Sequence, residues 1–218
     1  MNTQESILRI EQEKLIVIVR GVKNEQLIPL AEAMYRGGIR LLEVTYSADG
    51  STPDTETAKG IAMLKSHFGN RMAIGAGTVL TEEQVELTHR AGGEFIISPD
   101  TCEAVIKKTK ELGLVSIPGA MTPTEAQNAS RAGADFVKLF PVTSLGSAYV
   151  RAIRAPLSHI RFLAVGGIDT GNMAEYLAAG ACGFGISSGI VDKAMLANGD
   201  FEAITKLAKQ YIAALGGK

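Results

Sequence analysis

Short apolar runs alternate with longer amphipathic segments along almost the whole chain. The short runs are apolar on both faces, which is typical of parallel strands covered by helices. We expect eight such strands, over residues 15–19, 39–45, 71–75, 94–97, 114–117, 135–141, 161–165 and 182–186. Most of these runs follow a glycine or a Gly-Gly pair, which commonly ends a helix.

The segments between the strands carry helix-capping patterns. Hydroxyl and carboxylate side chains are expected to cap helices at Thr52, Thr81, Asp100, Thr122, and Asp169 or Thr170. One further helix, over residues 3–13, precedes the first strand, with Ile7, Leu8 and Ile10 as a weak apolar stripe.

Eight strands that alternate with helices predict an α/β fold, the (β/α)₈ TIM barrel, with residues 3–13 as an extra N-terminal helix. A doubly wound open sheet is the alternative. No linker rich in proline, glycine or serine divides the chain, so residues 1–218 are expected to form one domain.

Composition narrows the class of protein. The chain is 46% hydrophobic, so it can bury a sizeable core. Its net charge is -1 with no long basic run, which argues against nucleic-acid binding. Cys102 and Cys182 lie far apart, as in cytosolic proteins without disulfides. The polar N-terminus and the lack of an apolar run of about 20 residues argue against secretion and a membrane span. We therefore expect a soluble cytoplasmic protein.

A lysine lies within one apolar strand. Phe136, Lys138 and Phe140 share a face, since side chains alternate along a strand. Desolvation lowers the pKa of a buried lysine, and a neutral amine can attack a carbonyl carbon. Lys138 is therefore a candidate Schiff-base lysine. The alternative is a lysine that reaches solvent or pairs with a carboxylate.

Two more charged residues lie near the carboxyl ends of apolar strands. Arg20 ends the first strand, and Glu43 interrupts the second. Active sites of (β/α)₈ barrels lie at that end, so Arg20, Glu43 and Lys138 are expected to meet there. A buried ion-pair network that only fixes the fold is the alternative. Thr45 shares the face of Glu43, and Thr78 follows the third strand as a further candidate.

Glycine and serine follow the last two strands. Gly166 and Gly167 come after the seventh strand, and Ser187 and Ser188 after the eighth. Barrels often bind phosphate with these loops, although such glycines can also serve only tight turns. His67, His89 and His159 form no ligand pair, so we expect surface histidines and no metal site.

The motifs together resemble the 2-keto-3-deoxy-6-phosphogluconate (KDPG) and 4-hydroxy-2-oxoglutarate (KHG) aldolases. The resemblance covers nearly the whole chain and rests on Leu41-Leu-Glu-Val-Thr45, Gly75-Ala-Gly-Thr-Val-Leu80, Ile97-Ser-Pro99, Ile117-Pro-Gly119, Val137-Lys-Leu-Phe-Pro141 and Val165-Gly-Gly-Ile168. It implies a class I lyase that needs no metal or cofactor, forms a homotrimer, and releases pyruvate and an aldehyde such as glyceraldehyde 3-phosphate or glyoxylate.

The resemblance also implies roles for single residues. Lys138 matches the Schiff-base lysine, and Glu43 matches the general acid and base. The expected substrate-binding residues are Arg20, Thr78, Pro99, Gly166, Gly167, Ser187 and Ser188.

One position departs from the family pattern. Many members have an arginine for the pyruvyl carboxylate where this chain has Ser47, and Arg20 is the candidate replacement, as in the galactonate-specific branch. The departure leaves open which sugar acid is used. A phosphosugar isomerase or epimerase with Glu43 as base, and a non-catalytic sugar-acid-binding barrel, are the alternative functions.

Overall fold

The apolar runs pair into one parallel sheet in the computed structural model, which describes residues 2–216. The strands are β1 (Leu15–Val19), β2 (Leu41–Thr45), β3 (Ala73–Gly77), β4 (Phe95–Ile97), β5 (Val115–Ile117), β6 (Gly119–Ala120), β7 (Val137–Leu139), β8 (Phe162–Val165) and β9 (Gly183–Ile186). Their spatial order is β5-β4-β3-β2-β1-β9-β8-β7-β6.

β5 and β6 stand at the two ends of this order, yet they belong to one continuous stretch of chain. β5 and β6 are separated only by Pro118, which has no N–H group to donate to a ladder. β5 pairs with β4 and β6 pairs with β7. The N–H of Lys138 also donates to the Pro118 carbonyl at 2.9 Å. The sheet therefore closes into the predicted (β/α)₈ barrel, and the open-sheet alternative is wrong.

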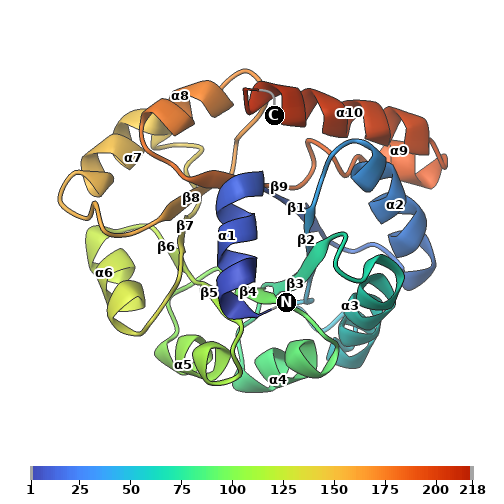
Figure 1. The fold of residues 1–218 in the computed structure, drawn as a ribbon, viewed down its shortest axis with the longest axis horizontal. Coiled ribbons are helices and arrows are strands. Elements are labelled where there is room, and N and C mark those ends of the chain that lie inside the picture. Colours follow the sequence, from blue (N-terminus) through green and yellow to red (C-terminus); the bar gives the residue numbers. More distant parts are fainter. Residues whose placement is uncertain (1, 217–218) are drawn as a thin grey trace.

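Helices form a ring outside the strands (Figure 1). The helices of the structure are α1 (Thr3–Glu13), α2 (Asn24–Arg36), α3 (Asp54–Phe68), α4 (Glu82–Arg90), α5 (Glu103–Glu111), α6 (Pro123–Arg131), α7 (Gly146–Arg154), α8 (Met173–Ala178), α9 (Lys193–Ala197) and α10 (Phe201–Ala214). α1, which follows the predicted bounds, lies across the barrel instead of in the ring.

The predicted helix caps are confirmed in part. The hydroxyls of Thr81 and Thr122 accept from the N–H groups three residues later, at the starts of α4 and α6. The residues directly before α3 and α5 are extended and make no side-chain cap bond, and α8 begins at Met173. The structure therefore contradicts the caps predicted at Thr52 and at Asp100. Of Asp169 and Thr170, it is Asp169 whose carboxylate accepts from backbone N–H groups, those of Gly171 and Asn172, in the turn that leads into α8.

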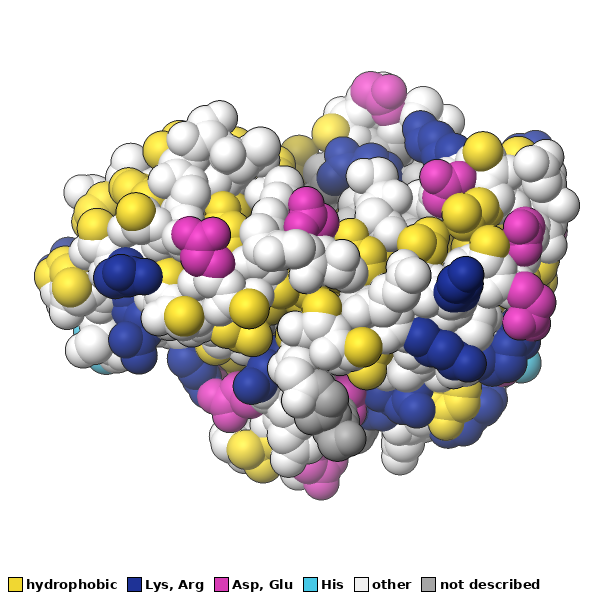
Figure 2. Space-filling model, turned by 90° about the horizontal axis from the view of Figure 1, so that it is seen from above, with side chains coloured by type: hydrophobic (Ala, Val, Ile, Leu, Met, Phe, Trp, Pro, Cys, Tyr) yellow, Lys and Arg dark blue, Asp and Glu magenta, His cyan; other side chains and the backbone are white. Residues whose placement is uncertain are grey.

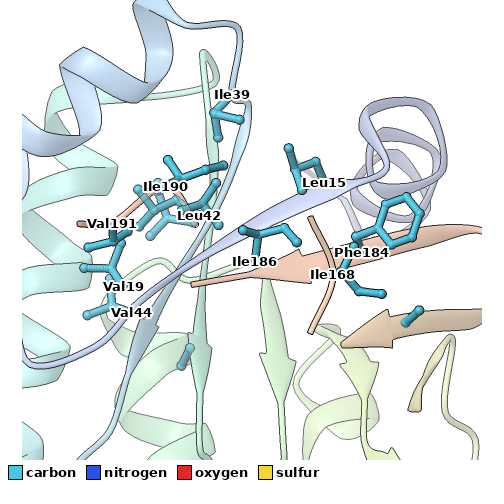
Figure 3. Close-up of a cluster of buried hydrophobic side chains, with 14 of the residues drawn as sticks. Leu15, Val19, Ile39, Leu42, Val44, Ile168, Phe184, Ile186, Ile190 and Val191 are labelled. Carbon is cyan, nitrogen blue, oxygen red and sulfur yellow. The ribbon is translucent and has the colours of Figure 1, made fainter. Parts of the chain in front are cut away.

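The strands bury two apolar layers because their side chains alternate. An outer cluster packs between strands and helices, and Figure 3 shows Leu42 and Val44 of β2 beside Ile190 and Val191. An inner cluster fills the barrel and comprises Ile7, Ile10, Ile16, Leu41, Ala73, Phe95, Ile97, Val115, Ile117, Phe136 and Leu163.

α1 closes the amino-terminal end of the barrel. Ile7 and Ile10 belong to the inner cluster, whereas Leu8 is 46% exposed, so the predicted apolar stripe is wrong at that residue. The Ser6 hydroxyl donates to Glu94 at 3.2 Å, which ties the helix to the residue before β4. A small molecule could then enter the barrel only from the carboxyl ends of the strands.

The surface mixes charges of both signs. On the face drawn in Figure 2, Lys and Arg side chains lie among Asp and Glu side chains, with apolar atoms scattered between them. Among the helices that the structure describes, none is long and apolar enough to cross a membrane.

The packing of α1 predicts that Ile10 and Leu8, two apolar residues of equal size, contribute differently to the free energy of unfolding. Ile10→Ala should lower the free energy of unfolding by about 2–5 kcal/mol, because it leaves a cavity in the inner cluster. Leu8→Ala on the same helix should change it by no more than about 0.5 kcal/mol. Urea unfolding of both variants measures the difference, and equal losses would contradict the account of α1.

Candidate active site

Two ionisable side chains point into the barrel near its carboxyl-terminal end. Glu43 lies in β2 and is 1% exposed, and Lys138 lies in β7 and is 7% exposed. Their neighbours two residues earlier, Leu41 and Phe136, belong to the inner apolar cluster. Strand alternation therefore continues each inward-facing row from an apolar side chain to a charged one.

The carboxyl group of Glu43 has a fixed position. Its Oε1 accepts a hydrogen bond from the Thr45 hydroxyl at 3.2 Å, whereas its buried Oε2 has no partner within residues 2–216. A Cβ atom at Gly77, in the neighbouring strand β3, would lie 1.5 Å from Oε1. Only glycine at this position leaves room for the carboxyl group, and one oxygen remains available for a proton.

Burial shifts both groups toward their neutral forms. Desolvation raises the pKa of Glu43, although the charges of Lys138 and Arg20 and the Thr45 hydroxyl oppose this shift. Desolvation lowers the pKa of Lys138, opposed by Glu43 and assisted by Arg20. A neutral amine is a nucleophile, and a carboxyl group with a raised pKa can move protons near neutral pH.

The pair is not held together as an ion pair. No salt bridge within the described residues joins Glu43, Lys138 or Arg20 to one another. The Lys138 ammonium position lies instead 4.6 Å from the centre of the Phe140 ring. This arrangement disfavours the interpretation that the charged groups serve only to fix the fold.

A cavity of about 750 Å³ opens above these groups, at the carboxyl ends of the strands. Eight of the nine predicted site residues line it, namely Arg20, Thr78, Pro99, Lys138, Gly166, Gly167, Ser187 and Ser188. Glu43 lies deeper, beside Lys138 in a small apolar void. The structure therefore brings all nine predicted residues to one end of the barrel.

Arg20 lies at the junction of three hollows. It directly follows β1, is exposed, and lines the main cavity as well as adjoining hollows of about 510 Å³ and 340 Å³. Ser47 lines only the smallest of the three, where its hydroxyl bonds to Asp49 within the same loop. Arg20, and not Ser47, can therefore present a cation to a ligand in the main cavity.

The loops after β8 and β9 form the part of the cavity wall between Arg20, which follows β1, and Lys138 on β7. Gly166 and Gly167 have φ values of +99° and +69°, and a Cβ atom on Gly167 would lie 2.9 Å from Thr143. Within residues 2–216, no protein atom accepts from the backbone N–H groups of Gly167, Ile168, Ser188 and Gly189. Free N–H groups on two adjacent loops are suited to an anionic oxygen group.

Sequence reasoning missed two residues of this site. Gly77 was visible only as part of a glycine-containing motif, and its close approach to Glu43 depends on the pairing of β2 with β3. Tyr211 also lines the cavity, although it belongs to α10 and not to one of the loops that follow the strands. No local pattern in the sequence points to it.

The described residues offer no metal centre. Within residues 2–216, no three His, Cys, Asp or Glu side chains are grouped to hold an ion. His67, His89 and His159 are exposed, as predicted, and the Nε2 atom of His67 lies 2.6 Å from Glu32.

Known proteins resemble this chain over almost its whole length. The family described as KDPG and KHG aldolase matches residues 5–207. A 2-dehydro-3-deoxy-phosphogluconate aldolase of Treponema pallidum is 35% identical over 95% of this chain and 96% of its own. A probable 2-dehydro-3-deoxy-6-phosphogalactonate aldolase of Rhizobium meliloti is 38% identical over 95% of each chain.

Solved structures show the same fold. A KDPG aldolase from Legionella pneumophila, with pyruvate captured at low pH as a covalent carbinolamine intermediate, superimposes with a TM-score of 0.81. It is 30% identical to this chain, and the match covers 90% of this chain and 93% of the other.

The hydrogen bond from Thr45 predicts a shift in the titration of Glu43. This bond lowers the pKa of the carboxyl group, so Thr45→Val should raise that pKa further, whereas Thr45→Ser keeps a hydroxyl and should not. The titration can be followed by NMR of the carboxyl carbon in protein labelled at glutamate, with Glu43→Gln to assign the signal. Equal titrations in the wild type and in Thr45→Val would show that the hydroxyl does not act on Glu43.

Proposed function

The chain belongs to the KDPG and KHG aldolase family, and from this we propose that it cleaves a 2-keto-3-deoxy sugar acid to pyruvate and an aldehyde through a Schiff base on Lys138. The family places it among the carbon–carbon lyases. The observation that carries the proposal is the buried lysine, whose pKa burial lowers, at the base of the cavity.

Lys138 starts the reaction as a neutral amine. Its nitrogen attacks the C2 ketone to form a carbinolamine. Glu43, which starts protonated because burial raises its pKa, supplies the proton with which the carbinolamine hydroxyl leaves as water, and this gives a protonated imine and a Glu43 carboxylate. This imine can accept the electron pair of the C3–C4 bond. The carbinolamine named in the Legionella pneumophila structure belongs to that aldolase, and it supports the same first step here.

Glu43 moves the protons. Its free Oε2, directly or through a water, takes the proton from the C4 hydroxyl as the C3–C4 bond breaks and the aldehyde leaves. The resulting enamine is then protonated at C3. Water adds to the imine carbon, which releases pyruvate and returns Lys138 to the free amine.

Arg20 is the proposed partner of the substrate carboxylate. A guanidinium group can bind a carboxylate through two parallel hydrogen bonds. Its positive charge also helps to lower the pKa of Lys138, which favours the nucleophilic amine. Thr78 and Pro99 follow β3 and β4 and also line the cavity, where they would contact the keto-acid part of the ligand.

A phosphorylated sugar acid is the proposed substrate class. The loops of Gly166, Gly167, Ser187 and Ser188 line the cavity, and four free N–H groups on these loops could bind a terminal phosphate. The curated relatives are named for the gluconate and the galactonate form of the acid. A direct assay with both acids measures which configuration at C4 this chain accepts.

The alternative functions differ from an aldolase in one step. An isomerase or epimerase would use Glu43 as a base without a covalent adduct, and a binding protein would hold a sugar acid without turnover. Neither requires a buried amine whose pKa is lowered, so Lys138 is the residue that separates them. The homotrimer and the cytoplasmic location stay predictions, and light scattering of the purified protein tests the first.

Trapping with pyruvate tests the Schiff base directly. Pyruvate and borohydride should leave a reduced pyruvyl adduct on Lys138, detected by intact mass and a peptide map. Lys138→Met should form no adduct, whereas Lys193→Met, which changes a lysine of the adjoining hollow, should react like the wild type. A folded wild type without an adduct, beside a reactive control aldolase, would overturn the proposal.

The role of Glu43 in proton transfer is tested separately. Glu43→Gln should lower kcat by about 10²–10⁴-fold.

Two variants of Arg20 distinguish the effect of its positive charge from the effect of its two-bond contact with the substrate carboxylate. Arg20→Gln should raise the KM for the sugar acid by about 10–100-fold, because a charge-assisted bidentate contact is lost. It should also move the pH midpoint of pyruvate trapping upward, since the charge of Arg20 lowers the pKa of Lys138. Arg20→Lys keeps the charge and should raise KM without moving that midpoint. Unchanged kinetics in Arg20→Gln would contradict the proposed role.

A further inference from the structure

A tyrosine hydroxyl lies unused in the wall of the active-site cavity. Tyr211, on α10, lines the cavity and is only 6% exposed. Its hydroxyl has no hydrogen-bond partner within residues 2–216. The hydroxyl atom itself is not enclosed by protein, since Glu43 Oε2 is the buried side-chain oxygen that lacks a partner among the described residues, so the Tyr211 hydroxyl is a donor that a ligand in the cavity could use.

The Tyr211 hydroxyl lies against the loop after β9. A Cβ atom at Gly189 would lie 2.1 Å from the Tyr211 Oη. The missing side chain at Gly189 therefore allows the phenol to reach the loop that carries Ser187 and Ser188. α10, which carries Tyr211, packs on α2 and α9.

The hydroxyl belongs to the anion-binding side of the cavity. Tyr211 lines it together with Gly167, Ile168, Ser188 and Gly189, whose N–H groups have no acceptor in the described chain. Four backbone donors and one phenolic donor thus line the same cavity, and Gly189 lies next to the phenol. A tetrahedral group with several acceptor oxygens suits such a set better than a single hydroxyl does.

The charges around Tyr211 keep it a donor. Burial raises the pKa of its phenol, and the nearby Asp169 carboxylate adds to that rise, so the phenol stays protonated at neutral pH. Asp169 also lines the cavity, but its Oδ1 accepts from the N–H groups of Gly171 and Asn172 at 2.8 Å and 3.1 Å. This exposed carboxylate is therefore engaged in its own loop.

We infer that the Tyr211 hydroxyl donates a hydrogen bond to the terminal phosphate of the substrate and so selects phosphorylated over unphosphorylated sugar acids. The inference rests on the proposed function and extends it to a residue outside the strand loops. In this role Tyr211 contacts the distal end of the substrate and takes no part in the steps at Lys138.

The test compares Tyr211→Phe with the wild type on two substrates. With the 6-phosphorylated 2-keto-3-deoxy acid, kcat/KM should fall about tenfold or more, as expected for a lost hydrogen bond to a charged group. With the same acid lacking the phosphate, kcat/KM should stay within about twofold. Tyr35→Phe, which removes a phenol on α2 away from the cavity, is the matched control and should change neither value.

Two further measurements distinguish a failure of the role of Tyr211 from a failure of the proposed function. Calorimetry with inorganic phosphate should show weaker binding to Tyr211→Phe than to the wild type, and pyruvate trapping on Lys138 should be equal in both. Equal losses on both substrates, or no loss on either, would overturn the role of Tyr211. A wild type that traps no pyruvate would overturn the proposed function alone, because the phosphate titration would still test Tyr211.

Discussion

The structure depends on the burial of an amine and a carboxyl group at one end of an apolar barrel. Desolvation is the largest influence on both Lys138 and Glu43, and it drives each toward its neutral form. Water at these positions would restore the charged lysine and remove the nucleophile. The apolar inner cluster, together with α1 across the amino-terminal end, keeps that end of the barrel closed.

Small residues make this burial possible. Glu43 fits only because Gly77 has no side chain, and the Thr45 hydroxyl fixes one carboxyl oxygen while the other stays free. The same principle recurs in the loop after β9, where Gly189 makes room for the phenol of Tyr211. In both places an absent Cβ atom lets a polar group of a neighbouring element reach the cavity.

The cavity has two chemically different sides. Lys138, with Glu43 below it, forms a low-dielectric side at which covalent chemistry is favoured. The loops after β8 and β9 form a side of backbone donors, suited to a phosphate that does not react. Arg20 lies where the cavity meets the adjoining hollows. This separation allows binding at the distal end to position the keto group over the amine.

The sequence by itself determined the elements and most of the candidate site. Alternating apolar runs and glycine stops are local signals, and they predicted the barrel, the extra helix and the residues at the strand ends. They could not predict the start of α3, where the extended Pro53 delays the helix, or the exposure of Leu8. Only the tertiary structure decided the fit of Glu43 against Gly77 and the approach of Tyr211 to Gly189. These contacts join segments far apart in the chain, and their geometry follows from strand pairing and helix packing, which no local pattern encodes.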